Sequence, residues 1–284
     1  MPCRFERTMP GATSEKEMHM KASEWKTIRY VVEDGVATLT LNRPAQKNAL
    51  DMVMRSELTE AMSAARRDRG IHALVLAGAG SAFCAGGDIR GMRSGNGSAE
   101  EGRDRMLDLH LWVEELINFD RPVIAAVDGP AFGAGFGLAL AADFVLATPR
   151  ARFCLSFMKL GLIPDCGVFY TLPRIVGVQR AKELAFSARE IGAEEARQLG
   201  IVSEIHDPET IGERARTIAL SFNNASLTAL SITKRAFNAS LNCGLGTLLE
   251  MEAAGQGVAR STEYHRNAVA AFLNKEPPPF SWPK

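Results

Sequence analysis

Residues 121–148 read RPVIAAVDGPAFGAGFGLALAADFVLAT, and this stretch decides the fold. It begins with five consecutive apolar residues, Val123 to Val127, which are typical of a buried strand. A glycine-rich turn follows, and then an apolar segment over residues 135–142 that we expect to be helical. A further short strand is expected over residues 144–147. Strand, turn, helix and strand in this order predict an α/β fold.

The same order of elements recurs toward the N-terminus. Two alternating segments, residues 28–32 and 36–41, flank an Asp-Gly turn and predict a hairpin. Helical spacing over residues 51–67 is followed by a buried strand over 73–77, and a helix is expected over about 103–118. The letters themselves do not repeat. Only the pattern of strand, strand and helix does, with a glycine-rich turn each time.

From about residue 181 the chain is expected to be mainly helical. The expected helices are 181–188, 193–198, 209–222, 226–238, 246–260 and 262–274. We therefore divide the chain into a flexible N-terminal extension (1–23), an α/β core (24–210) and a C-terminal helical region (211–284). The extension mixes acidic and basic residues without an apolar run, which opposes a secretory signal.

Composition excludes several classes of protein. The 284 residues are 46% hydrophobic and 23% charged, as in ordinary globular proteins. Thirty-three Lys and Arg balance 33 Asp and Glu, so nothing attracts nucleic acid or an anionic membrane to the whole surface. The five cysteines contain no C-x-x-C, which opposes a disulfide framework or a zinc site and favours a cytoplasmic location. We expect no metal. Charges, a proline and four glycines interrupt residues 123–147 too often for a membrane span.

Two glycine-rich turns each follow a buried strand. The first, Gly133-Ala134-Gly135, opens a helix but has Leu138 where a dinucleotide-binding loop needs a small residue. The second is the turn over residues 82–89. Two such turns could each direct one backbone N–H at a single oxygen and so form an oxyanion hole. Tight packing is the alternative, and on spacing alone it is the better explanation.

Five blocks of the sequence resemble the crotonase superfamily, also called the enoyl-CoA hydratase/isomerase family. They are LNRPAQKNAL (41–50), AFCAGGDI (82–89), the stretch over 121–148, FMKLGLIPDCG (157–167) and FSAREIGAEEARQLGIVSEI (186–205). The resemblance implies a crotonase-like ββα superhelix with a C-terminal helical trimerisation region. It also implies a homotrimer or dimer of trimers that acts on acyl-CoA thioesters, with coenzyme A as part of the substrate and no separate cofactor.

The resemblance also implies roles for individual residues. The two oxyanion donors of the family fall on the N–H groups of Gly87 and Ala134. Substrate and coenzyme A contacts fall on Ala45, Lys47, Ala85, Gly86, Asp88, Ile89, Phe132, Gly133, Phe157 and Pro164. For Asp88 we expect capping of the next turn rather than catalysis.

The departures from the family pattern predict the chemistry. Family hydratases use two glutamates, whose positions here hold Gly137 and Phe157. Since general acid–base catalysis needs a group within reach of the proton, we do not expect a standard hydration site. Asp165 is the acid that remains nearby, at the position of the single carboxylate in members that resemble enoyl-CoA isomerases.

A shift of a double bond needs only one base, and Asp165 is our candidate. Aromatic surroundings, expected from Phe132, Phe136 and Phe157, would raise its pKa by desolvation. The alternative is that Asp165 caps a helix that begins near Gly167. The neighbouring Cys166 is expected to be a small buried side chain rather than a nucleophile.

The sequence therefore predicts an enoyl-CoA isomerase, and two other functions stay open. One is a hydratase-like or hydrolase-like member that recruits water differently. The other is a non-catalytic homologue that binds acyl-CoA.

Overall fold

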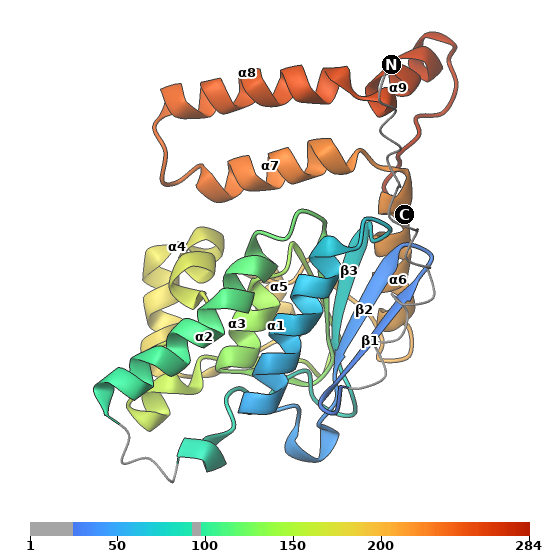
Figure 1. Cartoon of the computed structure of the whole chain (residues 1–284). Helices are drawn as coiled ribbons and strands as arrows, with labels where there is room; N and C mark the ends of the chain where they lie inside the picture. The colour runs from blue at the N-terminus through green and yellow to red at the C-terminus, as the bar shows by residue number, and fades with distance from the viewer. Residues whose placement is uncertain (1–24, 93–97) are drawn as a thin grey trace, which may run out of the picture.

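The computed structural model describes residues 25–92 and 98–284 (Figure 1). Its larger sheet has six strands in the order β1-β2-β3-β4-β6-β9, and a smaller sheet has the order β5-β7-β8. The strands are β1 Ile28–Glu33, β2 Val36–Leu41, β3 Ala73–Gly78, β4 Val123–Val127, β5 Pro130–Phe132, β6 Phe144–Ala147, β7 Arg152–Cys154, β8 Glu190–Gly192 and β9 Glu204–Ile205.

The helices follow the predicted order. The α-helices are α1 Met52–Arg67, α2 Ala99–Ile117, α3 Ala134–Leu140, α4 Val168–Ser187, α5 Ala193–Gln198, α6 Ile211–Ser221, α7 Leu227–Ala239, α8 Leu245–Ser261 and α9 Glu263–Leu273. The short 3-10 helices are η1 Pro44–Gln46, η2 Ile89–Met92, η3 Ser156–Leu160 and η4 Phe222–Asn224.

The N-terminal hairpin forms as predicted. β1 pairs antiparallel with β2, and Asp34 and Gly35 make the turn with φ of 50° and 75°. Two residues in the left-handed region give the turn a twist that matches that of the flanking strands. The other pairs of the larger sheet are parallel, from β2–β3 to β6–β9.

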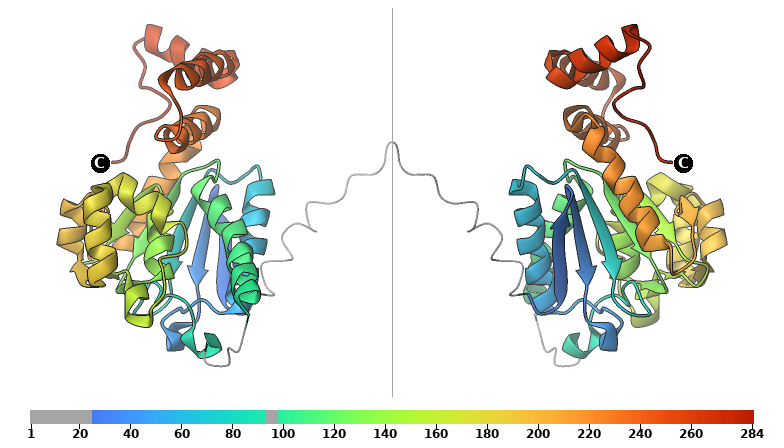
Figure 2. Two further views of the ribbon diagram at one scale, coloured as in Figure 1. Left: turned by 90° about the vertical axis from the view of Figure 1, so that its left-hand side faces the viewer. Right: turned by 90° about the vertical axis from the view of Figure 1, so that its right-hand side faces the viewer.

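Helices cover both faces of the larger sheet (Figure 2). Side chains of alternate residues point to opposite faces, so Leu74 and Leu76 of β3 join the core that α1, α2 and α3 cover. Ala73 and Val75 face the other way and pack with residues of α6. Burial on both faces explains why β3 and β4 read as continuous apolar runs.

Local caps set where the first two long helices begin. Asp51 caps α1, and its Oδ1 accepts the N–H of Met54 at 2.8 Å. Ser98 and Glu101 form a capping box that starts α2 at Ala99, four residues before the predicted start. These polar contacts supply partners for N–H groups that the first turn leaves unpaired.

The helical region differs from the prediction in its boundary. α6 lies against the larger sheet and belongs to the core, although we expected the appended region to begin at residue 211. The C-terminal arm, defined as α7, α8 and α9, instead projects from one end of the core in Figures 1 and 2, and α7 is attached to the core by the ion pair of Lys234 with Asp143 at 2.7 Å. After the arm the chain returns to the core, where Phe280 stacks on Phe222 with ring centroids 5.8 Å apart.

Several elements were not predicted. β5, β8 and β9 have two or three residues each, too few for a periodic signal. The expected helix over 181–188 is the end of α4, which begins at Val168 and is broken at Gly177 with φ of 76° and ψ of 158°. The predicted N-terminal extension lies outside the described residues. Within the described ranges, no helix is long and apolar enough to cross a membrane.

Candidate active site

The two glycine-rich turns lie side by side. The N–H of Cys84 donates to the carbonyl of Pro130 at 3.0 Å, and the N–H of Phe132 donates to the carbonyl of Cys84 at 2.9 Å. A Cβ atom placed on Gly86 would lie 3.6 Å from the backbone nitrogen of Ala134. The structure therefore brings the two predicted oxyanion segments together.

The geometry leaves both candidate N–H groups available. Leu50 donates to the carbonyl of Gly86 and accepts from the N–H of Asp88, so the N–H of Gly87 points to the opposite side. Ala134 is the first residue of α3, and its N–H lies outside the hydrogen bonds within that helix. Gly133 precedes it with φ of 52° and ψ of −121°, a conformation that glycine reaches at little cost.

The loop that carries Ala45 and Lys47 lies next to these turns. Both residues are exposed, and the carbonyl of Lys47 accepts the N–H of Ala85 at 2.9 Å. Asn48 is fully buried and fastens the loop, because its Nδ2 donates to the carbonyls of Ala79 and Ala82 at 2.9 and 2.7 Å. We did not single out Asn48 from the sequence, although it stands in a quoted block.

Asp88 is held in a structural role. Its Oδ1 accepts the N–H of Arg90 at 3.2 Å, at the start of η2, as expected for a capping residue. Its Oδ2 lies 3.1 Å from Arg43 and 2.8 Å from Arg90. Hydrogen bonds and charge from these arginines hold the pKa of Asp88 well below its usual range. Ile89, which follows it, is exposed.

Two of the three aromatic residues that we expected around Asp165 lie at the turn that carries Gly133. Phe157 is buried, and its Cζ is 3.8 Å from the position of a Cβ on Gly133. Phe132 is half-buried on β5. Phe136, by contrast, is completely buried and packs on Phe153 with ring centroids 5.2 Å apart. Phe136 is therefore a core residue rather than part of an open wall.

Asp165 does not cap a helix. The N-cap of α4 is Gly167, and no side chain caps that end. In the described part of the chain, Oδ1 of Asp165 is buried and has no hydrogen-bond partner. A buried carboxylate oxygen without a partner is costly, and it is typical of a functional position. The structure thus opposes the capping alternative.

The surroundings of Asp165 act on its ionisation in two directions. Burial is the largest effect and raises its pKa above the ordinary value. The neighbouring Cys166 thiol, Arg55 and His110 lower its pKa in part. Arg55 comes from α1 and His110 from α2, and neither was predicted to lie near Asp165. Their approach depends on tertiary packing, for which the sequence carries no local signal.

The position of the first hydratase glutamate is filled. A Cβ on Gly137 would lie 2.6 Å from the Cβ of Cys166 and 3.1 Å from its carbonyl oxygen. Real side chains do not approach so closely, so a residue larger than glycine at position 137 would have to displace Cys166. The absence of the first carboxylate is therefore built into the packing.

Neither cysteine of the site is a nucleophile. Cys84 and Cys166 are both buried, and burial raises the pKa of Cys84 to about 12. Burial and the charge of Asp165 raise the pKa of Cys166 as well. A thiol that keeps its proton at neutral pH is a poor nucleophile.

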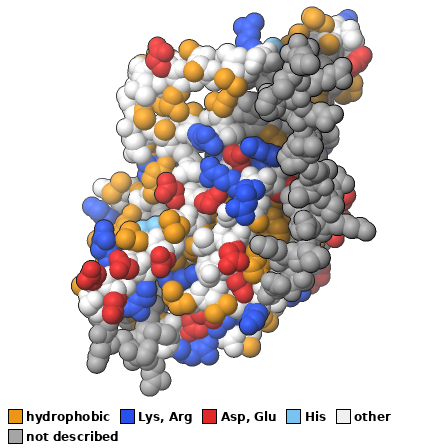
Figure 3. Space-filling model, in the orientation of Figure 1, with side chains coloured by type: hydrophobic (Ala, Val, Ile, Leu, Met, Phe, Trp, Pro, Cys, Tyr) orange, Lys and Arg blue, Asp and Glu red, His pale blue; other side chains and the backbone are white. Residues whose placement is uncertain are grey.

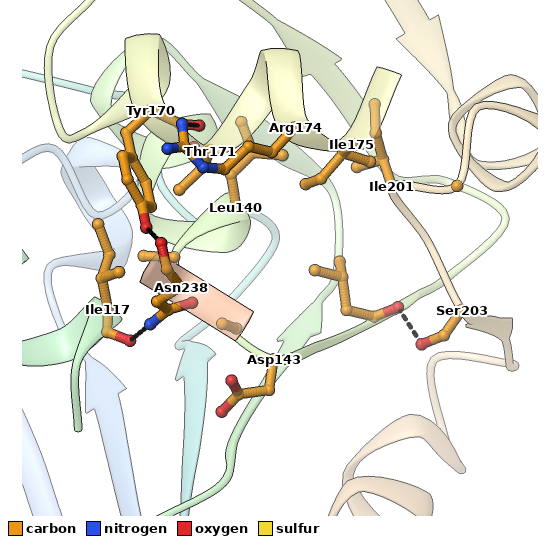
Figure 4. Close-up of a pocket in the computed structure, with 14 residues that line it drawn as sticks. Ile117, Leu140, Asp143, Tyr170, Thr171, Arg174, Ile175, Ile201, Ser203 and Asn238 are labelled. Atoms are coloured by element: carbon orange, nitrogen blue, oxygen red, sulfur yellow. Dashed lines mark hydrogen bonds between the residues drawn. The ribbon is translucent and has the colours of Figure 1, made fainter. Parts of the chain in front are cut away.

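A separate cavity of about 270 Å³ lies at the base of the C-terminal arm, between α4 and α7 (Figure 4). The Tyr170 hydroxyl donates to the carbonyl of Asn238 there, and Nδ2 of Asn238 donates to the carbonyl of Ile117 at 3.2 Å. None of the predicted site residues lines this cavity. Its contacts fasten the arm to the core.

The repeated ββα units and the two adjacent glycine-rich turns are those of the crotonase fold. The structure superposes on a crystal structure titled enoyl-CoA hydratase/isomerase from Cupriavidus metallidurans CH34 with a TM-score of 0.89. The two sequences are 44% identical, and the match covers 92% of this chain and 99% of the other.

The chain belongs to the enoyl-CoA hydratase/isomerase family, whose model matches residues 32–282. It is 38% identical over 252 residues to the 1,2-epoxyphenylacetyl-CoA isomerase of Escherichia coli (strain K12), covering 88% of this chain and 96% of that protein. It is also 40% identical over 261 residues to a protein of Rhodobacter capsulatus named as a probable enoyl-CoA hydratase. That match covers 90% of this chain and 98% of the relative.

Proposed function

We propose that the protein is an acyl-CoA double-bond isomerase that uses Asp165 as its base. The observation that carries this proposal is a buried oxygen of the Asp165 carboxylate that has no hydrogen-bond partner among the described residues, combined with a closed position at Gly137. By the resemblance described above, the hydratases of this family use two carboxylates to add water to a double bond. Movement of a double bond requires only one proton acceptor.

The proposed reaction conserves every atom of the substrate. Asp165 removes a proton from the carbon next to the thioester carbonyl, and the electron pair moves onto the carbonyl oxygen. The N–H groups of Gly87 and Ala134 hydrogen-bond the resulting dienolate oxygen. Asp165 then returns the proton to the far carbon of the former double bond. No water enters the product.

The raised pKa of Asp165 suits this role. A carboxylate with the ordinary pKa of about 4 is a weak base toward a carbon acid. Desolvation raises the pKa of Asp165 and so makes its carboxylate a stronger base. A base of this kind can take the proton from the carbon next to the carbonyl and return it to the far carbon of the former double bond.

Substrate binding is assigned to the surfaces around the two turns. We infer that the loop with Ala45 and Lys47 and the residues Ala85 and Ile89 contact coenzyme A, and that Phe132, Phe157 and Pro164 contact the acyl part. Coenzyme A enters and leaves as part of the substrate, and no further cofactor is proposed.

The C-terminal arm supports an assembly of subunits. Phe237 is 73% exposed on α7 and Phe272 is 81% exposed on α9. Figure 3 shows further hydrophobic side chains along the arm. Exposed apolar side chains that gather on one part of a surface favour burial against another chain of the same protein. We infer a homotrimer or a dimer of trimers.

A screen of purified protein against 3-enoyl, 2-enoyl and ring-derived CoA thioesters tests the proposal. We expect turnover of a 3-enoyl-CoA or of a ring-derived thioester, whose inclusion follows the name of the E. coli relative. Faster hydration of a 2-enoyl-CoA would establish the hydratase-like alternative. Binding of all thioesters without turnover would establish the non-catalytic homologue.

A further inference from the structure

We propose that Arg43 is a positioning residue for the oxyanion hole: its guanidinium group ties Asp51 to Asp88 and so fixes the direction of the backbone N–H of Gly87. This inference rests on the proposed function, in which that N–H binds the oxygen of the thioester carbonyl. Arg43 itself is assigned no contact with the substrate.

The two successive glycines of the turn, Gly86 and Gly87, give the first argument. A Cβ on Gly86 would lie 2.8 Å from the carbonyl oxygen of Phe132, and Gly86 has φ of 98°. Packing and backbone conformation therefore require glycine at this position. Glycine also gives the backbone its greatest conformational freedom, so contacts from outside the turn must fix the direction of the Gly87 N–H.

A short backbone bridge supplies part of this constraint. The N–H of Leu50 donates to the carbonyl of Gly86 at 2.8 Å, and the carbonyl of Leu50 accepts the N–H of Asp88 at 3.0 Å. Leu50 and Gly87 form an isolated parallel bridge that lies outside the named strands. A single bridge restrains two segments less than the ladder of a full strand pair does.

The Arg43 side chain joins the same two segments a second time. Its Nη2 lies 3.1 Å from Oδ2 of Asp51 and 3.1 Å from Oδ2 of Asp88. These two aspartates directly follow the two residues of the bridge in the sequence. The Nη1 of Arg43 also donates to the carbonyl of Ala49 at 2.5 Å. A planar guanidinium group can hold several oxygens in one fixed arrangement, and Arg43 uses this to lock the bridge.

Arg43 is itself held firmly. Its side chain is 14% exposed and that of Asp88 is 10% exposed, so water screens their charges less than it screens a surface pair. The N–H of Arg43 donates to Oδ1 of Asn48 at 2.9 Å, and its carbonyl accepts the N–H of Asn48 at 3.0 Å. Backbone and side chain of Arg43 are thus both fixed relative to the turn.

Arg90 does not duplicate this contact. It lies 2.8 Å from Oδ2 of Asp88, but its side chain is 64% exposed and it follows Asp88 by only two residues. A contact between such close neighbours stabilises the turn itself. It does not tie the turn to the segment that carries Leu50, as Arg43 does.

Steady-state kinetics of Arg43→Met gives the first test. The negative charge on the oxygen develops only as the reaction proceeds, so a misdirected N–H lowers kcat and leaves KM nearly unchanged. We expect kcat for the best thioester to fall about ten- to hundredfold, less than the loss that follows removal of a whole oxyanion donor. Arg43→Lys should recover only part of this loss, because an ammonium group lacks the planar fork.

Arg189→Met is the matched control. Arg189 also bridges two carboxylates, Glu183 at 2.5 Å and Glu195 at 2.6 Å, but these join α4 to α5. Denaturant titration of both variants measures the stability that each guanidinium contributes. We expect Arg189→Met to keep the parent kcat whatever stability it loses, whereas a merely structural role of Arg43 predicts the parent kcat for both variants.

Infrared spectroscopy of bound hexanoyl-CoA, labelled with carbon-13 at the thioester carbonyl, gives a test that does not depend on turnover. Hydrogen bonds from an oxyanion hole lower the stretching frequency of this carbonyl. The parent, Arg189→Met and Asp165→Asn should therefore share one lowered frequency. In Arg43→Met the frequency should move back toward that of hexanoyl-CoA in buffer.

The outcomes separate this inference from the proposed function. If Asp165→Asn keeps its activity, the assignment of the base is wrong, and the carbonyl frequencies still decide the role of Arg43. If Arg43→Met keeps the parent frequency and kcat, or raises KM alone, the positioning role is overturned. A parent protein that does not lower the frequency would contradict the oxyanion hole and the role of Arg43 together.

Asp88→Asn decides the question if Arg43→Met does not fold. Asn keeps the size of Asp88 and removes the charge that Arg43 holds. We expect kcat and the carbonyl frequency to change in the same directions as for Arg43→Met. Parent values of both in Asp88→Asn would overturn the proposal.

Discussion

The buried carboxylate of Asp165 destabilises the folded protein, and no element of the fold depends on it. Its Oδ1 is buried without a hydrogen-bond partner in the described part of the chain, and burial raises its pKa. The cap of α4 uses Gly167 instead, so no helix depends on the carboxylate. Groups that destabilise the folded state in this way are typical of functional sites.

Replacement of Asp165 by Asn removes the base but keeps the shape of the side chain. We expect turnover of the best thioester to fall by about 10²–10⁴, which is the usual contribution of a general base. Affinity for the CoA ester should change little, because the coenzyme is assigned to other surfaces. Steady-state kinetics together with a binding titration checks both. Turnover within about threefold of the parent, far short of that loss, would return Asp165 to a structural role.

The same variant should be more stable than the parent at pH 7. The pKa of Asp165 is raised in the folded protein, so its charge destabilises the fold at pH values above that pKa. The parent recovers this stability as the pH falls through the folded pKa, and the recovery is complete below about pH 4, the unfolded value. Asn carries no charge, so its advantage should vanish there. Chemical denaturation at pH 7 and pH 4 measures the difference, and an advantage that is equal at both values would contradict the assignment.

At the scale of elements, α3 and the turn before α4 are matched to one another. Gly137 on α3 and Cys166 in that turn share a space that holds only one side chain. We expect Gly137→Ala to destabilise the protein by about 1–3 kcal/mol, as other overpacked cores are. Denaturant titration measures this loss. A neutral effect in the parent, or no relief in the double variant with Cys166→Gly, would show that the two segments move apart easily.

The loop that carries Ala45 and Lys47 depends on Asn48. Asn48→Ala leaves the carbonyls of Ala79 and Ala82 without their donor, at a cost of about 1–3 kcal/mol for buried groups. Because this loop is assigned to coenzyme A, we expect KM to rise more than kcat falls. Kinetics at fixed pH checks the ratio. A fall in kcat alone would place the effect at the reacting atoms instead.

Most elements of the core could be predicted from the sequence. β3 and β4 are apolar runs bounded by glycine or polar residues, and α1 carries a regular apolar face behind the cap of Asp51. The short strands β5 and β9 could not be predicted, because two or three residues give no periodicity. A helix that begins near Gly167 was anticipated, but its continuation to Ser187 was missed, since Pro173 and Gly177 interrupt its pattern.

Some features of the candidate site could likewise be predicted from the sequence, and others could not. The resemblance assigned the two N–H groups to Gly87 and Ala134, and the structure places the glycine-rich turns that carry them side by side. The closure of position 137 by Cys166 and the approach of Arg55 and His110 to Asp165 join distant parts of the chain. No local pattern encodes such contacts, so they required the folded structure.

At the scale of the whole molecule, the C-terminal arm has exposed apolar side chains that one chain leaves uncovered. We expect light scattering at micromolar concentration to show three or six chains. Each exposed phenylalanine buried in a contact contributes about 1.5–3 kcal/mol, so Phe237→Ser and Phe272→Ser should weaken the assembly. Glu252→Gln, a change of an exposed residue on α8, is the control. A parent protein that is a monomer at this concentration would contradict the inferred role of the arm.

The most direct test of the account is the fate of a single 3-enoyl-CoA incubated with the purified protein. Mass spectrometry separates the two reactions, because isomerisation conserves mass and hydration adds one water. With position 137 closed by Cys166 and Phe157 in place of the second glutamate, we predict a 2-enoyl-CoA of unchanged mass, formed well before any hydrated product. Formation of the hydrated thioester at the faster rate, from this substrate or from crotonyl-CoA, would contradict the assignment of one carboxylate and one proton shift.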